Sequence, residues 1–253
     1  MIELKTDAEL AVMRKASRIV AEILDELRQT VRPGISTAEL DELAERRTLE
    51  KGAQPAFKGY GPHGIPFPCS LCVSVNEEIV HGIPGRRRLR PGDIVSLDFG
   101  VIYQGFYGDA ALTVAVGTIS PQAERLMEVT RAALYAGIEQ ARAGQRISDI
   151  ARAVERTAHQ AGFAVVEEFA GHGIGRRLHE EPQVPNYFSR GMPNPRLQVG
   201  MVLAIEPMVN QGGRDLRILS DGWTAVTTDG KLSAHFEHSV AITERGPEIL
   251  TEL

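Results

Sequence analysis

Apolar residues recur every three or four positions over 10–27, which is the spacing of one buried helix face. Thr6 and Glu9 stand just before this run as a capping box, a common start signal for a helix. Ser36 and Glu39 repeat the signal further along the chain. The pattern therefore predicts two helices within the first fifty residues.

Alternation replaces this helical spacing near residue 93. Residues 95, 97, 99 and 101 are apolar and fall on one face of a strand, whereas Ser96 and Asp98 fall on the other. The helical pattern then returns over about 120–141 and 148–162, so the order of helices before strands occurs twice. Further strand signals lie at 71–75, 110–116, 163–167, 201–206, 223–227 and 236–243.

Three short motifs occur twice and in the same order. Gly34-Ile35-Ser36 resembles the stretch from Gly144 to Ser148, His81-Gly82-Ile83-Pro84 resembles His172-Gly173-Ile174-Gly175, and Gly92 and Gly200 are each followed six residues later by a carboxylate, Asp98 and Glu206. We interpret this as an internal duplication with halves of roughly 1–117 and 118–253. The chain is expected to be a single domain of the α+β class, with a pseudo-two-fold antiparallel sheet covered by helices. The axis would bring the two carboxylates face to face.

Composition narrows the class of protein. The 253 residues carry 28 basic and 33 acidic side chains, a formal net charge of −5, which argues against a nucleic-acid binder that relies on overall charge. The two cysteines, Cys69 and Cys72, are too few for a four-thiolate zinc site. The N-terminus lacks a signal-peptide pattern, and no apolar stretch reaches membrane-spanning length. We expect a cytoplasmic protein without membrane contact.

Carboxylates within apolar strands are the unusual feature of the sequence. Asp98, Asp109, Glu206 and Glu237 all occupy such positions, and no Lys or Arg lies in the same runs. Buried carboxylates repel one another unless a cation lies between them. His172, in a Gly-His-Gly-Ile-Gly stretch, adds a nitrogen donor. The set predicts a site for divalent metal, with two ions resolving the repulsion better than one.

The donor types restrict the metal. Oxygen ligands with one imidazole suit Mn, Fe, Co or Zn, and fit neither a thiolate zinc site nor a calcium loop. Each residue taken alone has an ordinary alternative: a solvent-facing strand residue, a turn aspartate, or a hydrogen-bonded structural histidine. Their order, their spacing and the duplication together favour the metal site.

Long stretches of the chain resemble the bacterial type I methionine aminopeptidases, which have the pita-bread fold. The similar stretches cover nearly the whole chain: SVNEEIVHGIP (74–84), GDIVSLDFGV (92–101), GFYGDAALTVAVG (105–117), GHGIGRRLHEEPQVPNY (171–187), GMVLAIEPMV (200–209) and DGWTAVTTDGKLSAHFEHSVAIT (221–243). The resemblance implies a dinuclear metallo-exopeptidase that removes N-terminal methionine from nascent proteins with a small second residue. The implied reaction is attack of a metal-bridging hydroxide on the scissile carbonyl.

The resemblance also implies roles for the metal ligands. Asp98 would chelate one ion, Asp109 and Glu237 would bridge both, and His172 with Glu206 would complete the other. Glu206 would in addition take the proton of the attacking water.

Two further histidines and an apolar slot are implied on the substrate side. His179 would hydrogen-bond the scissile carbonyl, and His81 would contact the substrate backbone near the scissile nitrogen. We assign no ligand role to His235 or His238, and place His63 in a loop and His159 on a helix surface. The methionine slot would be lined by Cys72, Tyr60, Trp223, Phe57 and Leu178. The last two depart from the Cys and the aromatic residue common in the family.

Other functions remain open at this stage. An X-Pro aminopeptidase or prolidase-like enzyme has the same fold but carries an additional N-terminal domain, which we do not expect here. A peptide-binding module without catalysis would have lost ligands, and all five are present. Arg86, Arg87, Arg88 and Arg90 could contact the ribosome transiently, although a solvated turn is the simpler interpretation. We expect a monomer with no specific nucleic acid.

Overall fold

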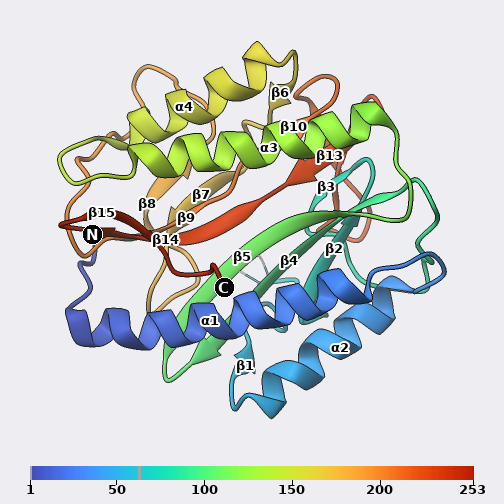
Figure 1. Ribbon diagram of the computed structural model, residues 1–253, viewed down its shortest axis with the longest axis horizontal. Coiled ribbons are helices and arrows are strands. Elements are labelled where there is room, and N and C mark those ends of the chain that lie inside the picture. Colours follow the sequence, from blue (N-terminus) through green and yellow to red (C-terminus); the bar gives the residue numbers. More distant parts are fainter. Residues whose placement is uncertain (1, 62–63) are drawn as a thin grey trace.

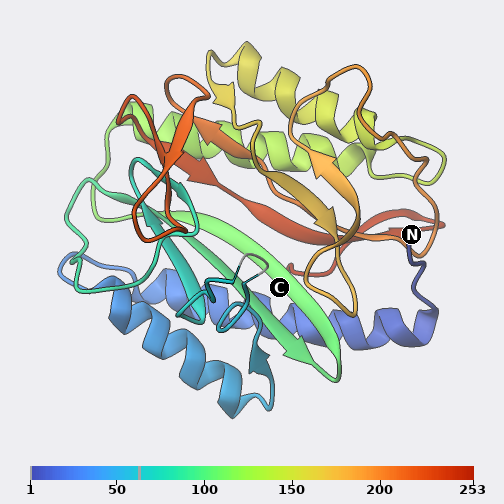
Figure 2. The ribbon, with the colours of Figure 1, turned by 180° about the vertical axis from the view of Figure 1, so that it is seen from behind.

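The computed structural model describes residues 2–61 and 64–253. Two pairs of helices lie on one face of a curved antiparallel sheet, and in the reverse view loops and short strands lie on the other face (Figures 1 and 2). The helices are α1 (Asp7–Thr30), α2 (Thr37–Glu50), α3 (Pro121–Gln140) and α4 (Ile147–Gln160). This arrangement confirms the predicted α+β class.

The main sheet runs in the order β1-β4-β5-β14-β9-β7-β8, with β2 on β4 and β15 on β14. Its strands are β1 (Gln54–Pro55), β2 (Leu71–Val75), β4 (Ile94–Tyr103), β5 (Phe106–Ala115), β7 (Ala170–Gly173), β8 (Glu180–Pro185), β9 (Val202–Ile205), β14 (Glu237–Thr243) and β15 (Gly246–Ile249). Two small sheets flank it: β13 (Ser233–His235), β10 (Met208–Asn210) and β6 (Ala164–Val165), and β11 (Leu216–Ile218), β12 (Ala225–Thr227) and β3 (Glu78–Val80).

The helix starts follow the capping signals, with one exception. Both predicted capping boxes are present, at Thr6 and at Ser36. Helix α4 begins one residue before the predicted Ser148. The carboxylate of Asp149, in the first turn, accepts a hydrogen bond from the backbone N–H of Arg146 at 2.8 Å and so stabilises the earlier start.

Strand β5 begins four residues earlier than the sequence predicted. The cause is a two-residue hairpin, in which Tyr103 pairs with Phe106 and the intervening Gln104 and Gly105 have φ values of 49° and 79°. Positive φ at both turn residues matches the twist of the strands it joins. The pairing therefore continues from β4 into β5 without a gap.

The same backbone contacts recur in the two halves. The N–H of Gly34 donates to the carbonyl of Leu89 at 2.7 Å, and that of Gly144 donates to Leu197 at 2.9 Å. The guanidinium groups of Arg88 and Arg196 donate to the carbonyls of those same glycines. These corresponding contacts are what the predicted internal duplication would produce.

Helix α1 packs closely against Gly108 of β5. A Cβ there would lie 2.8 Å from the backbone nitrogen of Ser17. We expect Gly108→Ala to reduce the free energy of unfolding by about 1–3 kcal/mol, because helix and strand backbones must separate. Urea unfolding would measure the loss. Gly85→Ala, with no atom within 4 Å of its new Cβ, should change stability by less than about 0.5 kcal/mol; equal effects of the two changes would contradict this packing argument.

Within residues 2–61 and 64–253, no helix has both the length and the apolar character needed to cross a membrane. Both cysteines are free thiols, and Cys72 is buried. The Cys-x-x-Cys spacing therefore does not mark a disulfide.

Candidate metal centre and substrate cavity

Strand register places three of the predicted carboxylates on one face of the sheet. Asp98 of β4 and Glu237 of β14 both pair with Ala111 of β5, so the three residues form one row across the strands. Residues directly opposite one another share a face, as do residues two apart along a strand. Asp109 lies two residues before Ala111 and therefore points to the same side.

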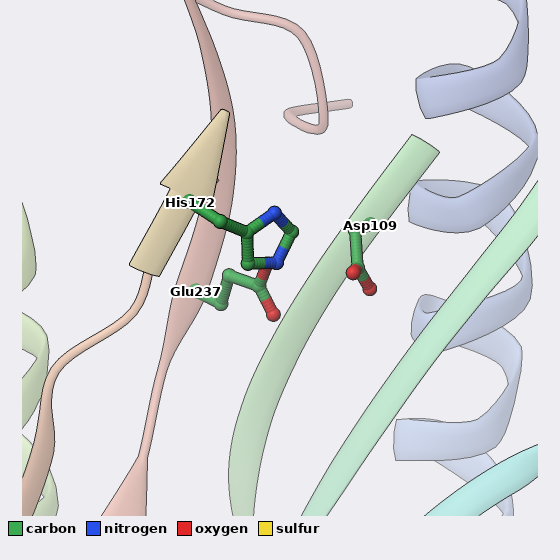
Figure 3. A group of neighbouring side chains, drawn as sticks. All are labelled: Asp109, His172 and Glu237. Atoms are coloured by element: carbon green, nitrogen blue, oxygen red, sulfur yellow. The ribbon is translucent and has the colours of Figure 1, made fainter. Parts of the chain in front are cut away.

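The second half of the chain contributes its side chains by the same rule. His172 of β7 pairs with Ala204 of β9, and Glu206 follows two residues later. Figure 3 shows Asp109, His172 and Glu237 converging from three different strands. One donor atom from each of these three residues lies within 4.8 Å of the others. Side chains from both parts of the chain therefore converge at this point of the sheet.

Burial makes this group of acids unusually basic. Removal from water raises the pKa of Asp98 to about 7 and that of Glu206 to about 8. The pKa values of Asp109 and Glu237 lie well above their usual range, first because of burial and then because of the neighbouring carboxylates. Without a cation, the protein holds these groups by keeping them protonated.

The residues fit a bound divalent metal. Oδ1 of Asp109, Oε1 of Glu237 and both ring nitrogens of His235 are buried without a hydrogen-bond partner among the described residues. The ion pairs that the structure gives Glu206 are with histidines, and no Lys or Arg lies among them. Buried polar atoms without a hydrogen-bond partner destabilise the folded state unless an ion binds to them.

A hydrogen bond fixes His172 as a nitrogen donor. Its Nδ1 lies 2.9 Å from the carbonyl oxygen of Gly173. A carbonyl oxygen can only accept, so the proton of the neutral ring is on Nδ1 and the lone pair is on Nε2. Burial lowers the pKa of His172 to about 3, which keeps the ring neutral. Nε2 lies 3.6 Å from Oε1 of Glu206, on the side of the carboxylates.

Close contacts with neighbouring strands explain why glycine stands on either side of His172. A Cβ on Gly171 would lie 2.3 Å from the carbonyl oxygen of Ala204, and one on Gly173 would lie 2.3 Å from that of Glu181. The sequence suggested close backbone approach to a ligand or a turn; the approach is to the neighbouring strands. It lets the short strand β7 fit between β8 and β9.

His235, to which the sequence analysis gave no ligand role, lies beside this centre. Its Nε2 lies 3.6 Å from Oε2 of Glu206, and Glu206, His235 and Glu237 form a second group of donors within 4.8 Å. A sequence signal existed, because His235 and Glu237 are two residues apart and so face the same way along an extended chain. Asp98 lies outside both compact donor groups but shares the row of Ala111 with Glu237.

A cavity of about 790 Å³ opens beside the acidic group. Both predicted substrate histidines line it, and burial lowers the pKa of His81 to about 4 and also lowers that of His179. The five residues predicted for the methionine slot also line the cavity, and they pack together in one apolar cluster: Phe57, Tyr60, Cys72, Leu178 and Trp223.

Some cavity residues were missed and some histidines lie elsewhere. The ring of Phe67 packs edge-on against Trp223 with the ring centroids 5.3 Å apart, and Phe169 packs in the same way against His81 at 5.2 Å. No sequence spacing predicted either phenylalanine. His238 contacts Thr251 instead of the cavity, and His159 is exposed on α4 as expected. His63 lies outside the described residues.

Comparison with solved structures tests the fold. The crystal structure of a methionine aminopeptidase from Thermotoga maritima superimposes with a TM-score of 0.96 at 44% identity, covering 100% of both chains. A prolidase from Pyrococcus furiosus has a TM-score of 0.80 at 22% identity, over 99% of this chain and 65% of that one, and shares the fold alone. The predicted pita-bread fold is confirmed.

Comparison of sequences gives the family. Methionine aminopeptidase 1 of Bacillus subtilis (strain 168) is 52% identical over 255 residues, covering 100% of both chains, which confirms the resemblance seen in the motifs. Residues 11–244 match the family described as Metallopeptidase family M24. The chain therefore belongs to metallopeptidase family M24.

Proposed function

We propose that the chain is a methionine aminopeptidase that removes N-terminal methionine from nascent proteins with a small second residue. The observation that carries the proposal is the contact between a group of buried acids and an apolar cavity lined by His81 and His179. Full-length relatives with that name support the choice of substrate.

Two divalent ions fit the donor set best. Asp98, Asp109 and Glu237 would hold one, while Asp109, His172, Glu206 and Glu237 would hold the other, so that two carboxylates are shared. Co, Mn, Fe and Zn all suit oxygen donors with imidazole. When bound, such ions polarise a carbonyl and lower the pKa of water.

The chain's own residues supply binding and proton transfer. Glu206 accepts the proton of the attacking water, because its carboxylate would lie beside the bound ions and the reacting water. His179 donates a hydrogen bond to the scissile carbonyl as negative charge develops on its oxygen. His81 contacts the substrate backbone near the scissile nitrogen, and burial keeps its ring neutral.

The apolar cluster binds the methionine side chain. Phe57, Cys72 and Leu178 are each at most 8% exposed, so the slot is lined by buried apolar side chains. An unbranched thioether gains burial there without leaving a polar atom unpaired. Tyr60 and Trp223 are partly buried and close the remaining sides.

A pair of peptide substrates tests the proposed function. We expect the metal-loaded protein to hydrolyse Met-Ala peptides and to leave Ala-Pro peptides nearly intact. Preference for Ala-Pro would replace the proposal by a prolidase-like activity. A protein that binds no divalent ion after dialysis, and gains no hydrolysis when ions are added, would be a peptide-binding module.

The setting of the enzyme completes the proposal. We place it in the cytoplasm as a monomeric, single catalytic domain with halves of roughly 1–117 and 118–253. Arg87 is paired with Glu78, whereas Arg86 and Arg90 are exposed and free to meet ribosomal RNA transiently. Salt-dependent cosedimentation with ribosomes would support this contact, and absence of cosedimentation at low salt would refute it.

A further inference from the structure

A hydrogen bond joins the rim of the cavity to the proposed oxyanion-stabilising histidine. The hydroxyl oxygen of Tyr60 lies 2.7 Å from Nδ1 of His179, and the two rings are 5.4 Å apart. Either atom could donate in principle, since an imidazole nitrogen donates when protonated and accepts when it is not. The direction of this bond therefore decides which nitrogen of His179 carries the ring proton.

The chemistry of the pair favours the tyrosine as donor. Burial raises the pKa of Tyr60, so the phenol keeps its proton at neutral pH. A phenol O–H is a stronger donor than a neutral imidazole N–H, and an imidazole nitrogen is a stronger acceptor than a phenol oxygen. In the described part of the chain, the Tyr60 hydroxyl has no other hydrogen-bond partner to take its proton. Nδ1 of His179 is then the acceptor.

The neighbouring His172 provides the opposite case. Its Nδ1 donates to the carbonyl of Gly173, which leaves Nε2 as a lone pair for a cation. The centroids of the two imidazole rings are 4.2 Å apart. One ring must nevertheless donate a lone pair to a metal, whereas the other must donate a hydrogen bond to a carbonyl. Opposite partners at Nδ1, a carbonyl oxygen and a phenol, give the two rings these opposite properties.

Both ends of the hydrogen bond are held in place. The backbone N–H of Tyr60 donates to Phe57, and its carbonyl accepts from Phe67. On the other side, Glu180 follows His179 directly and forms a buried ion pair with Lys5. Because neither side can move freely, the phenol also fixes the plane of the imidazole.

We propose that Tyr60 is a positioning residue that holds His179 in the tautomer with its proton on Nε2, directed at the substrate carbonyl. Tyr60 thus has a role beyond lining the methionine slot. This inference rests on the proposed function for the role of His179, but the position of the proton can be measured without any turnover.

Long-range ¹H–¹⁵N correlation spectra of the histidine rings give the tautomer directly. The sample is ¹⁵N-labelled protein, first metal-free and then with Zn²⁺, at a pH where the rings are neutral, and the His179→Gln variant identifies the His179 signals. We expect the proton of His179 on Nε2 and that of His172 on Nδ1. A wild-type His179 protonated on Nδ1 would overturn the proposal, whatever the activity.

Tyr60→Phe then tests the tyrosine, since it removes the hydroxyl and keeps the ring. We expect mixed tautomers at His179 and a kcat lower by about fivefold to tenfold with KM changed less than about twofold, the size of one lost hydrogen bond. Tyr135→Phe is the matched control, because Tyr135 contacts His238 far from the cavity; it should alter neither the His179 signals nor kcat.

The remaining outcomes separate the two proposals. Unchanged His179 signals in Tyr60→Phe, or a raised KM at constant kcat, would show that Tyr60 only lines the slot. If His179→Gln keeps full activity while the spectra show the expected tautomer, the role of His179 in the proposed function fails and the hydrogen-bond assignment stands.

Discussion

Glu206→Gln is expected to lower kcat by about 10²- to 10⁴-fold, the usual contribution of a general base. The amide has nearly the same shape as the carboxylate, but it cannot accept a proton from water. Four other proposed ligands, Asp98, Asp109, His172 and Glu237, remain, so the variant should still bind metal. Steady-state hydrolysis of a Met-Ala peptide gives kcat, and elemental analysis of the same sample gives the metal content.

Metal content decides how the result is interpreted. Low kcat with at least one ion retained supports Glu206 as proton acceptor, whereas activity close to that of the wild type would refute that role. Glu22→Gln on the exposed side of α1 is the control for replacing a carboxylate, and it should leave kcat unchanged. A variant that lost all metal would show Glu206 to be chiefly a ligand.

Above the pH range in which the buried histidines contribute, the metal-free protein is expected to lose stability as the pH rises from about 7 to about 8.5. The pKa of Asp98 is about 7 and that of Glu206 about 8 in the folded state, against 3.8 and 4.5 as ordinary values. Buried histidines such as His81 and His172 stay neutral in the folded state and have the opposite effect below their ordinary value of 6.5. From about pH 7 to pH 8.5 the folded state therefore binds more protons than the unfolded state, and the free energy of unfolding falls with increasing pH. Each pKa unit between the folded and unfolded states corresponds to about 1.4 kcal/mol, so the free energy of unfolding should fall by a few kcal/mol.

Added metal should remove most of this loss. The ion replaces the protons between the carboxylates, and a concentration 100-fold above Kd adds about 2.7 kcal/mol. Urea unfolding near pH 7 and pH 8.5, with chelator or with Zn²⁺, gives the four free energies to compare. Glu206→Gln removes one titrating group and should flatten the metal-free dependence. Metal-free stability that rises with pH would mean that the acids are not held protonated.

Local signals predicted the long elements well. Helices α1 and α2 begin at capping residues, and β4 shows a clear alternation of apolar and polar residues. Both signals depend on neighbours in sequence, so the sequence alone predicts these elements. Several strands escaped prediction because three or four residues are too few to show a period, as in β7, β10 and β13. Their pairing partners, not their own sequences, make them strands.

The centre was predictable for a different reason. A carboxylate inside an apolar strand is unfavourable unless it has a partner, and a single sequence shows such positions at Asp98 and Glu237. His235 was missed because a histidine in a strand is unremarkable, and its contact with Glu206 depends on strands far apart in the chain. The hydrogen bond between Tyr60 and His179 likewise joins residues 119 positions apart.

The central strands β5 and β14 pair over just two positions, with Ser239 adding hydrogen bonds to the backbone of Asp109. The proposed ligands lie on both sides of this junction. Cations bound there would hold the two parts of the chain together at this short strand pairing. Depleting the ions should therefore loosen the molecule along its midline first, so that backbone amides of these two strands exchange with solvent sooner than those beneath the helices.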